Sequence, residues 1–184
     1  MQYYGILVCF LFSLYHLVKL RNKRSLLFFL AGLFTAFADY YLTYRMDNYL
    51  LGVSLFCVVQ TFYAIIFIDK KSILLRIVTL LVTYPIVING LKVNDPIALL
   101  SIYSIVNLIY NVIFAFIKKD YLAAAGLLLF LVCDISVGLC NIDSYLPSSN
   151  FLHEIQTIAS PLIWLAYFPS QTIIQLSGGK NEEK

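Results

Sequence analysis

The sequence has few charged residues, few histidines and no paired cysteines, and each shortage excludes a class of protein. Only 12% of the 184 residues are charged, whereas a soluble domain carries about 25% because its surface faces water. With two distant histidines and no CxxC pair, the chain offers no typical zinc site. No phosphate-binding loop or nucleophile elbow is present. We therefore expect no metal, no cofactor and no nucleic-acid partner.

The four cysteines are Cys9, Cys57, Cys133 and Cys140. All four lie inside apolar runs, which argues against a disulfide framework.

Long apolar runs make up most of the chain. Hydrophobic residues account for 61% of the sequence, in runs of roughly 18–22 residues that match a hydrocarbon core about 30 Å thick. The runs are continuous rather than alternating, which favours helices over strands. The sequence predicts an all-α polytopic integral membrane bundle with seven transmembrane helices at 2–18, 25–44, 49–68, 73–90, 97–117, 121–142 and 158–177.

The domain organisation predicted from these runs is simple. Residues 1–177 form a single transmembrane domain, and residues 178–184 form a disordered cytoplasmic tail that is rich in glycine and charge. The longest loop, 143–150, is polar and contains Pro147. It leads into the segment 151–157, which is apolar enough to lie along the membrane surface.

The basic residues predict the orientation, because cytoplasmic loops carry an excess of Lys and Arg. Of the 13 basic residues, the loops on one side and the C-terminal tail hold all except Arg45 and Lys92. The N-terminus is therefore expected outside and the C-terminus in the cytoplasm. The compact, prokaryote-like chain suggests a bacterial plasma membrane. The larger basic set is Lys19, Arg21, Lys23, Arg24, Lys70, Lys71, Arg76, Lys118, Lys119, Lys180 and Lys184.

Two carboxylates, Asp39 and Asp134, lie well inside predicted spans. Ionisable groups at such depth are costly and usually face the bundle interior or a wet cavity. Asp39 lies 14 residues after Ser25, and Asp134 lies 14 residues after Asp120. Since a helix rises 1.5 Å per residue, both aspartates sit about 21 Å above the cytoplasmic boundary. Their equal depth allows them to meet if the two helices are neighbours.

Five of the predicted helices each carry a stripe of polar or small residues. In a bundle such stripes turn inward, either to bond helix to helix or to line a cavity. We expect Trp164, Tyr103 and Tyr167 to line a cavity for a single-chain amphiphile, because aromatic rings pack on an acyl chain and offer a polar edge. The stripes are Gly32, Thr35, Asp39 and Thr43; Gln60 and Tyr63; Tyr103, Asn107, Tyr110 and Asn111; Asp134, Gly138 and Asn141; and Trp164, Tyr167, Gln171 and Gln175.

Four segments on these stripes resemble motifs of the YhhN/TMEM86 family, whose characterised members are lysoplasmalogenases. Gly32–Leu42 (GLFTAFADYYL) resembles the first aspartate motif, with Ala38 in place of a glycine. Gly52–Tyr63 (GVSLFCVVQTFY) resembles the next motif, with Gln60 at the position of a histidine. Gly126–Asp134 (GLLLFLVCD) resembles the second aspartate motif, and Tyr167–Ile174 (YFPSQTII) resembles the closing one. The four matches keep the family order.

The resemblance implies hydrolysis of the vinyl-ether bond of a lysoplasmalogen, giving a fatty aldehyde and a glycerophospho-alcohol. Asp39 and Asp134 would be the general acid and base, because a carboxyl group among apolar helices can stay protonated near neutrality while a second one activates water. The partners would be an ether-linked lysophospholipid and membrane lipid. The substrate-binding residues would be Gln60, Tyr63, Tyr103, Asn107, Asn141, Trp164, Tyr167 and Gln171.

Two other functions fit the same residues. Gln60 replaces a possible proton carrier, which favours a non-catalytic lipid-binding or regulatory protein of the same fold. A small proton-coupled carrier would use Asp39 and Asp134 as proton or cation sites. Transporters often contain internal repeats or broken spans, and no clear repeat is visible here.

Overall fold

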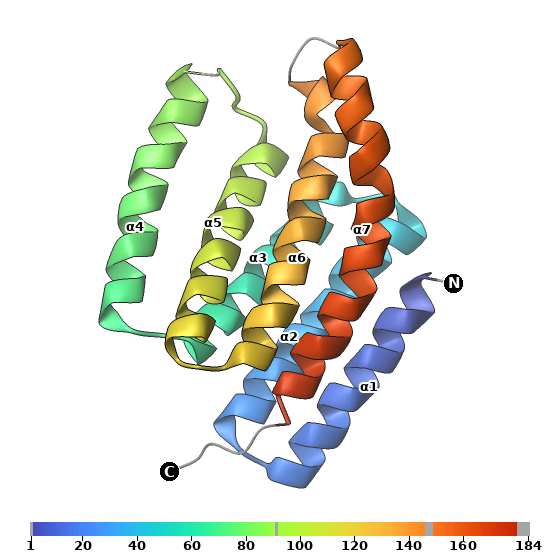
Figure 1. Cartoon of the computed structure of the whole chain (residues 1–184), viewed down its shortest axis with the longest axis vertical. Coiled ribbons are helices and arrows are strands. Elements are labelled where there is room, and N and C mark those ends of the chain that lie inside the picture. The colour runs from blue at the N-terminus through green and yellow to red at the C-terminus, as the bar shows by residue number, and fades with distance from the viewer. Residues whose placement is uncertain (1, 91, 146–148, 180–184) are drawn as a thin grey trace.

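The structure is a computed structural model that describes residues 2–90, 92–145 and 149–179. These residues form seven α-helices and no strand (Figure 1), so the predicted all-α fold is confirmed and the helix count agrees with the predicted seven. The α-helices are α1 (Gln2–Leu20), α2 (Lys23–Asp39), α3 (Tyr49–Ile66), α4 (Lys70–Pro85), α5 (Pro96–Ile117), α6 (Tyr121–Cys140) and α7 (Asn150–Ser177). Short π-helical segments η1 (Tyr40–Arg45) and η2 (Ile86–Gly90) extend α2 and α4, and a 3-10 turn, η3 (Ile142–Ser144), follows α6.

Five of these helical segments have the length and apolar composition needed to cross a membrane: Lys23–Arg45, Tyr49–Ile66, Lys70–Gly90, Pro96–Ile117 and Tyr121–Cys140. A shorter apolar helix covers Tyr4–Leu20. At 28 residues, α7 is the longest helix, although polar residues recur along it. Several apolar helices of membrane-spanning length indicate an integral membrane protein.

Polar side chains start six of the helices in the manner expected for N-caps, where a short side chain accepts one of the free backbone N–H groups. These contacts explain why the helices begin where they do, directly after short polar links. The pairs are Asn22 with Ser25, Asn48 with Leu51, Asp69 with Lys71, Asp95 with Ala98, Asp120 with Ala123, and Ser149 with Leu152.

One boundary differs clearly from the prediction. The last helix begins at Asn150 rather than at 158, so the segment 151–157 forms its first two turns instead of lying apart as a surface segment. The hydroxyl of Ser149 caps this start by accepting the N–H of Leu152 at 3.3 Å. The predicted loop residue Pro147 and the tail residues 180–184 lie outside the described residues.

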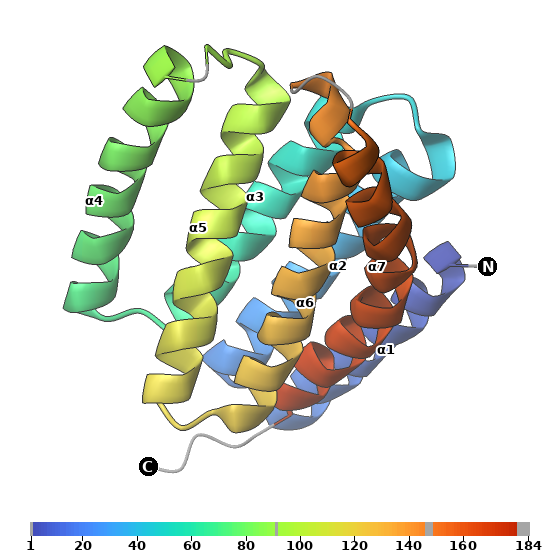
Figure 2. The ribbon, with the colours of Figure 1, turned by 45° about the horizontal axis from the view of Figure 1, so that its top comes forward.

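Helices α2, α3, α5, α6 and α7 close a ring through successive contacts, and the most extensive of these joins α6 to α7. Outside the ring, α1 lies against α2 and α7, while α4 packs on α5 alone among the described helices (Figures 1 and 2). Inside the ring, the side chain of Phe130 packs between Phe56 and Tyr167 with its ring tilted against both, and both pairs of ring centroids are 5.8 Å apart. Aromatic contacts therefore connect α3, α6 and α7 at the centre.

Most of the described Lys and Arg residues lie at the lower end of the bundle in Figure 1, where α2, α4 and α6 begin. We call this the basic end. At this end Arg24 of α2 forms an ion pair with Asp120, the N-cap of α6. The same guanidinium donates to the backbone oxygen of Ser177 at 3.4 Å, at the end of α7. One side chain thus connects three helices of the ring.

Gly126 and Gly138, both on α6, provide a test of the close packing between α6 and α7. A Cβ atom added at Gly126 would lie 2.9 Å from the backbone nitrogen of Ile174. Gly126→Ala should therefore push the helices apart and destabilise the fold by about 1–3 kcal/mol, the usual cost of overpacking. Thermal unfolding in detergent measures this loss. Gly138→Ala is the control, because a Cβ there meets nothing within 4 Å. Equal melting temperatures for the two variants would contradict the packing described.

Candidate active site

Asp39 lies at the point where α2 changes into the π-helix η1. Its side chain is only 3% exposed, and its Oδ2 accepts a hydrogen bond of 2.6 Å from the hydroxyl of Tyr167 on α7. The Thr43 hydroxyl also bonds the backbone oxygen of Asp39 at 2.7 Å, within the π-helical segment. π-Helical turns are frequent at functional sites, and Asp39 directly precedes one.

Asp134 comes from α6 and is partly buried. Its carboxyl group is close enough to interact electrostatically with that of Asp39 and with the hydroxyl of Tyr167. The thiols of Cys57 and Cys133 also lie within its electrostatic reach. Within the described ranges no side chain or backbone group donates a hydrogen bond to Asp134. Helices α2, α6 and α7 thus bring the two aspartates and Tyr167 into one site.

The aromatic residues near this site differ in exposure. Tyr167 is buried between the ring of Phe130 and that of Trp164, which meets it edge to face with centroids 6.3 Å apart. Trp164 itself is 38% exposed. It therefore lies between the buried site and the outer surface of the bundle.

Three of the predicted substrate-binding residues carry buried polar atoms that have no protein partner. These atoms are the side-chain nitrogens of Gln60 and Gln171 and the hydroxyl of Tyr63. Buried polar groups are almost always hydrogen-bonded, so such atoms require water or a ligand. The prediction that these side chains face the interior agrees with their complete or nearly complete burial.

The predicted polar stripe of α6 is only partly inside the bundle. Beyond Asp134, Gly138 is exposed, and so is Asn141. The amide of Asn141 donates to the backbone oxygen of Val137 at 2.8 Å, within its own helix. Among the described residues nothing lies within 4 Å of a Cβ added at Gly138, so the space beside this glycine is open. The expectation that the whole stripe turns inward is therefore wrong for these two residues.

Arg76 is an interior residue that the sequence analysis missed. The sequence analysis uses it only as one of the basic residues that set the orientation, although it falls in the predicted span 73–90; in the structure it lies within α4 and is 7% exposed. Its guanidinium donates to the hydroxyl of Ser72 at 2.9 Å, to the side-chain oxygen of Asn107 at 2.8 Å and to that of Asn111 at 2.9 Å. Asn111 continues the network by donating to the side-chain oxygen of Gln60 at 3.0 Å. The network therefore ties α4 to α5 and α5 to α3.

Two further polar contacts involve α5. The hydroxyl of Tyr103, which is partly buried, pairs with that of Thr61 on α3 at 3.0 Å. The amide nitrogen of Asn107 donates to the backbone oxygen of Tyr103 at 2.9 Å. Tyr103 thus connects α5 to α3, and Asn107 connects α5 to α4 through Arg76. Neither side chain forms a hydrogen bond to the aspartates.

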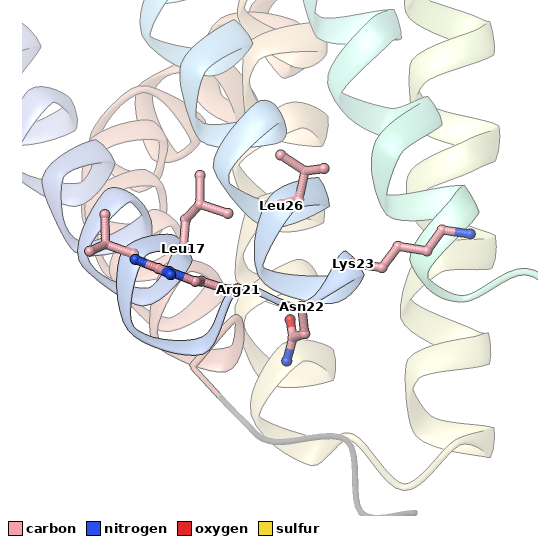
Figure 3. Close-up of a pocket in the computed structure, with 6 residues that line it drawn as sticks. Leu17, Arg21, Asn22, Lys23 and Leu26 are labelled. Carbon is pink, nitrogen blue, oxygen red and sulfur yellow. The ribbon is translucent and has the colours of Figure 1, made fainter.

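A pocket at the basic end is separate from the aspartate site. It lies at the turn between α1 and α2 and is lined by Leu17, Val18, Arg21, Asn22, Lys23 and Leu26. The side chains of Arg21 and Lys23 point in opposite directions from this turn (Figure 3). None of the lining residues belongs to the predicted site. In the part of the chain that the structure describes, no group of three or more His, Cys, Asp or Glu side chains could hold a metal ion.

The Arg76 network makes a prediction about stability. Arg76→Leu leaves the side-chain oxygens of Asn107 and Asn111 without their donor, and buried groups that lose a partner cost about 1–3 kcal/mol each. The melting temperature in detergent should therefore fall. Arg45→Leu serves as the control because the Arg45–Asp47 ion pair is largely exposed, and exposed pairs contribute little. An Arg76→Leu protein that is as stable as the Arg45→Leu protein would contradict this role.

No protein-family model, no curated protein and no solved structure matches this chain. The resemblance to the YhhN/TMEM86 motifs therefore stays a prediction.

Proposed function

We propose that this protein hydrolyses the vinyl-ether bond of a lysoplasmalogen, with Asp39 and Asp134 as its catalytic acid and base. The observation that carries the proposal is that the carboxyl groups of Asp39 (α2) and Asp134 (α6) interact electrostatically around Tyr167, whose hydroxyl is hydrogen-bonded to Asp39. Intramembrane carboxylates are expensive and usually mark a functional site. The sequence resemblance supplies the bond that is cleaved, and the two aspartates supply chemistry that suits this bond.

A vinyl ether hydrolyses through protonation at carbon, which gives an oxocarbenium ion that water attacks. The reaction needs a proton donor near the carbon and a negative charge near the cation. Two interacting carboxyl groups can supply both, since they do not readily ionise together. Removal from bulk water strengthens the stabilisation of the cation by a fixed negative charge. The reaction therefore needs no metal or organic cofactor.

The proposed substrate is an amphiphile with one acyl-type chain, and it enters from the surrounding lipid. We expect the substrate to contact Trp164 first, because this side chain is partly exposed and contacts Tyr167. The unpartnered polar atoms of Gln60, Tyr63 and Gln171 are available to bond polar groups of the substrate or waters. Tyr103, Asn107 and Asn141 complete the proposed binding set, and each of them also has a protein hydrogen-bond partner.

We further propose that the basic end faces the cytoplasm, with the N-terminus outside and the C-terminus inside, in a bacterial plasma membrane. The support is the uneven distribution of Lys and Arg between the two ends of the bundle. Reporter fusions should be active in the cytoplasm after Leu20, Lys71 and Lys119, and outside after Asn48. An even number of crossings would contradict this orientation.

The competing function is lipid binding without catalysis, and the environment of Gln60 favours it. This residue replaces the family histidine, and its side-chain oxygen is engaged by Asn111. A binding protein would retain lysolipid but release no aldehyde. Measuring lipid retention beside aldehyde release separates the two functions.

Purified protein given a lysoplasmalogen should release a fatty aldehyde, and Asp39→Asn or Asp134→Asn should reduce the rate by about 10²–10⁴-fold, as is typical for the loss of a general acid or base. Asparagine keeps the shape of the side chain, so the variants should stay folded and monodisperse. Asp143→Asn is the control, since this carboxyl group is exposed in η3. Wild-type rates in either core variant would end the proposal.

A further inference from the structure

We infer that the two aspartates hold different protonation states at rest, with Asp39 as the carboxylate and Asp134 as the carboxylic acid, and that Tyr167 is the positioning residue that separates them. The catalytic roles that follow from this assignment rest on the proposed function. The resting protonation states do not, because they follow from the hydrogen bonds and charges around each side chain.

Asp39 has the environment of a carboxylate. The hydroxyl of Tyr167 donates to its Oδ2 at 2.6 Å, and both side chains are buried. An ionised carboxylate can only accept hydrogen bonds, and a donor directed at it favours the charged form. Such charge-assisted bonds are short and strong. The charge on Asp39 therefore has a fixed partner from α7.

Asp134 has the environment of a neutral acid. No hydrogen-bond donor reaches it among the described residues, and no Lys, Arg or His forms an ion pair with it. The titratable groups that face it are Asp39, Tyr167, Cys57 and Cys133, of which none is a cation. Arg76 gives its donors to Ser72, Asn107 and Asn111. A second negative charge beside Asp39 would lack both a donor and a counter-ion, which is costly inside a membrane protein.

These states assign the steps of the proposed reaction. Asp134 gives its proton to the vinyl carbon, and the negative charge of Asp39 stabilises the oxocarbenium ion. Water then adds to the cationic carbon while Asp39 accepts its proton, and a hemiacetal forms. In the last step Asp39 returns this proton to the glyceryl oxygen as the C–O bond breaks. Asp134 takes the hemiacetal hydroxyl proton, which regenerates both resting states and releases the aldehyde and the alcohol.

The assignment predicts an infrared signature in the resting protein, reconstituted in lipid vesicles without substrate. A protonated carboxyl group has a C=O stretch separate from the amide and carboxylate bands, and ¹³C labelling of aspartate identifies it. At neutral pH the wild type should show this band. Asp134→Asn should lose the band, whereas Asp39→Asn should keep it.

Tyr167→Phe tests the positioning role. Without its donor, Asp39 should bind a proton more readily, so the carboxyl band should grow at a higher pH than in the wild type. Tyr110→Phe is the control, because that hydroxyl bonds Thr79 on α4 and not an aspartate. If Tyr167 only supported packing, the pH at which the band grows would be the same in both variants, and this result would overturn its role.

The outcomes separate this inference from the proposed function. A band that disappears in Asp39→Asn and persists in Asp134→Asn would reverse the assignment, and a wild type without the band at neutral pH would overturn it. If the band behaves as expected but no aldehyde is released, the protonation states stand and the hydrolase proposal fails. If aldehyde is released but the band belongs to Asp39, the hydrolase proposal stands with the two roles exchanged.

Discussion

The hydrogen bond from Tyr167 to Asp39 is the interaction on which the proposed site depends. It joins α7 to α2 through two buried side chains that lie 128 residues apart in the chain. Within apolar surroundings a polar group must find its partner inside the protein, because lipid offers none. Asp39 meets this constraint through Tyr167, whereas Asp134 beside it receives no donor within the described residues. The difference between two chemically identical side chains therefore comes from one tyrosine.

The same constraint explains how the other helices are connected. Arg24 joins the beginnings of α2 and α6 near the end of α7, and Arg76 joins α4 to α5. At the opposite end the hydroxyl of Tyr145 donates to Asp95 at 2.6 Å, which lowers the pKa of that carboxyl group. These contacts use long polar side chains to connect different parts of the bundle. The most extensive contact between two helices is that of α6 with α7.

The sequence predicted the helices well because their determinants are local. Apolar runs predicted seven helices, and the described residues form seven, while residue spacing predicted the same depth for Asp39 and Asp134. Periodicity shows which residues share a face, but it does not show which faces a neighbour covers. The sequence therefore places Asn141 on an inward stripe, whereas the structure leaves it exposed. Arg76 was missed because it lies near the end of the predicted span 73–90, where a basic residue is explained by orientation alone. The hydrogen bond between Tyr167 and Asp39 depends on how α2 and α7 meet, and no local pattern reports this.

The central claim is that the two carboxyl groups share one site inside the bundle. Solid-state NMR on protein in lipid bilayers, with ¹³C-labelled aspartate and tyrosine, tests it directly. A correlation between the carboxyl carbons of Asp39 and Asp134 should appear, and Asp134→Asn should remove it. The correlation between Asp39 and Tyr167 serves as the internal reference for distance, since these side chains are hydrogen-bonded. A spectrum with the Asp39–Tyr167 correlation and without the one between the aspartates would contradict the shared site.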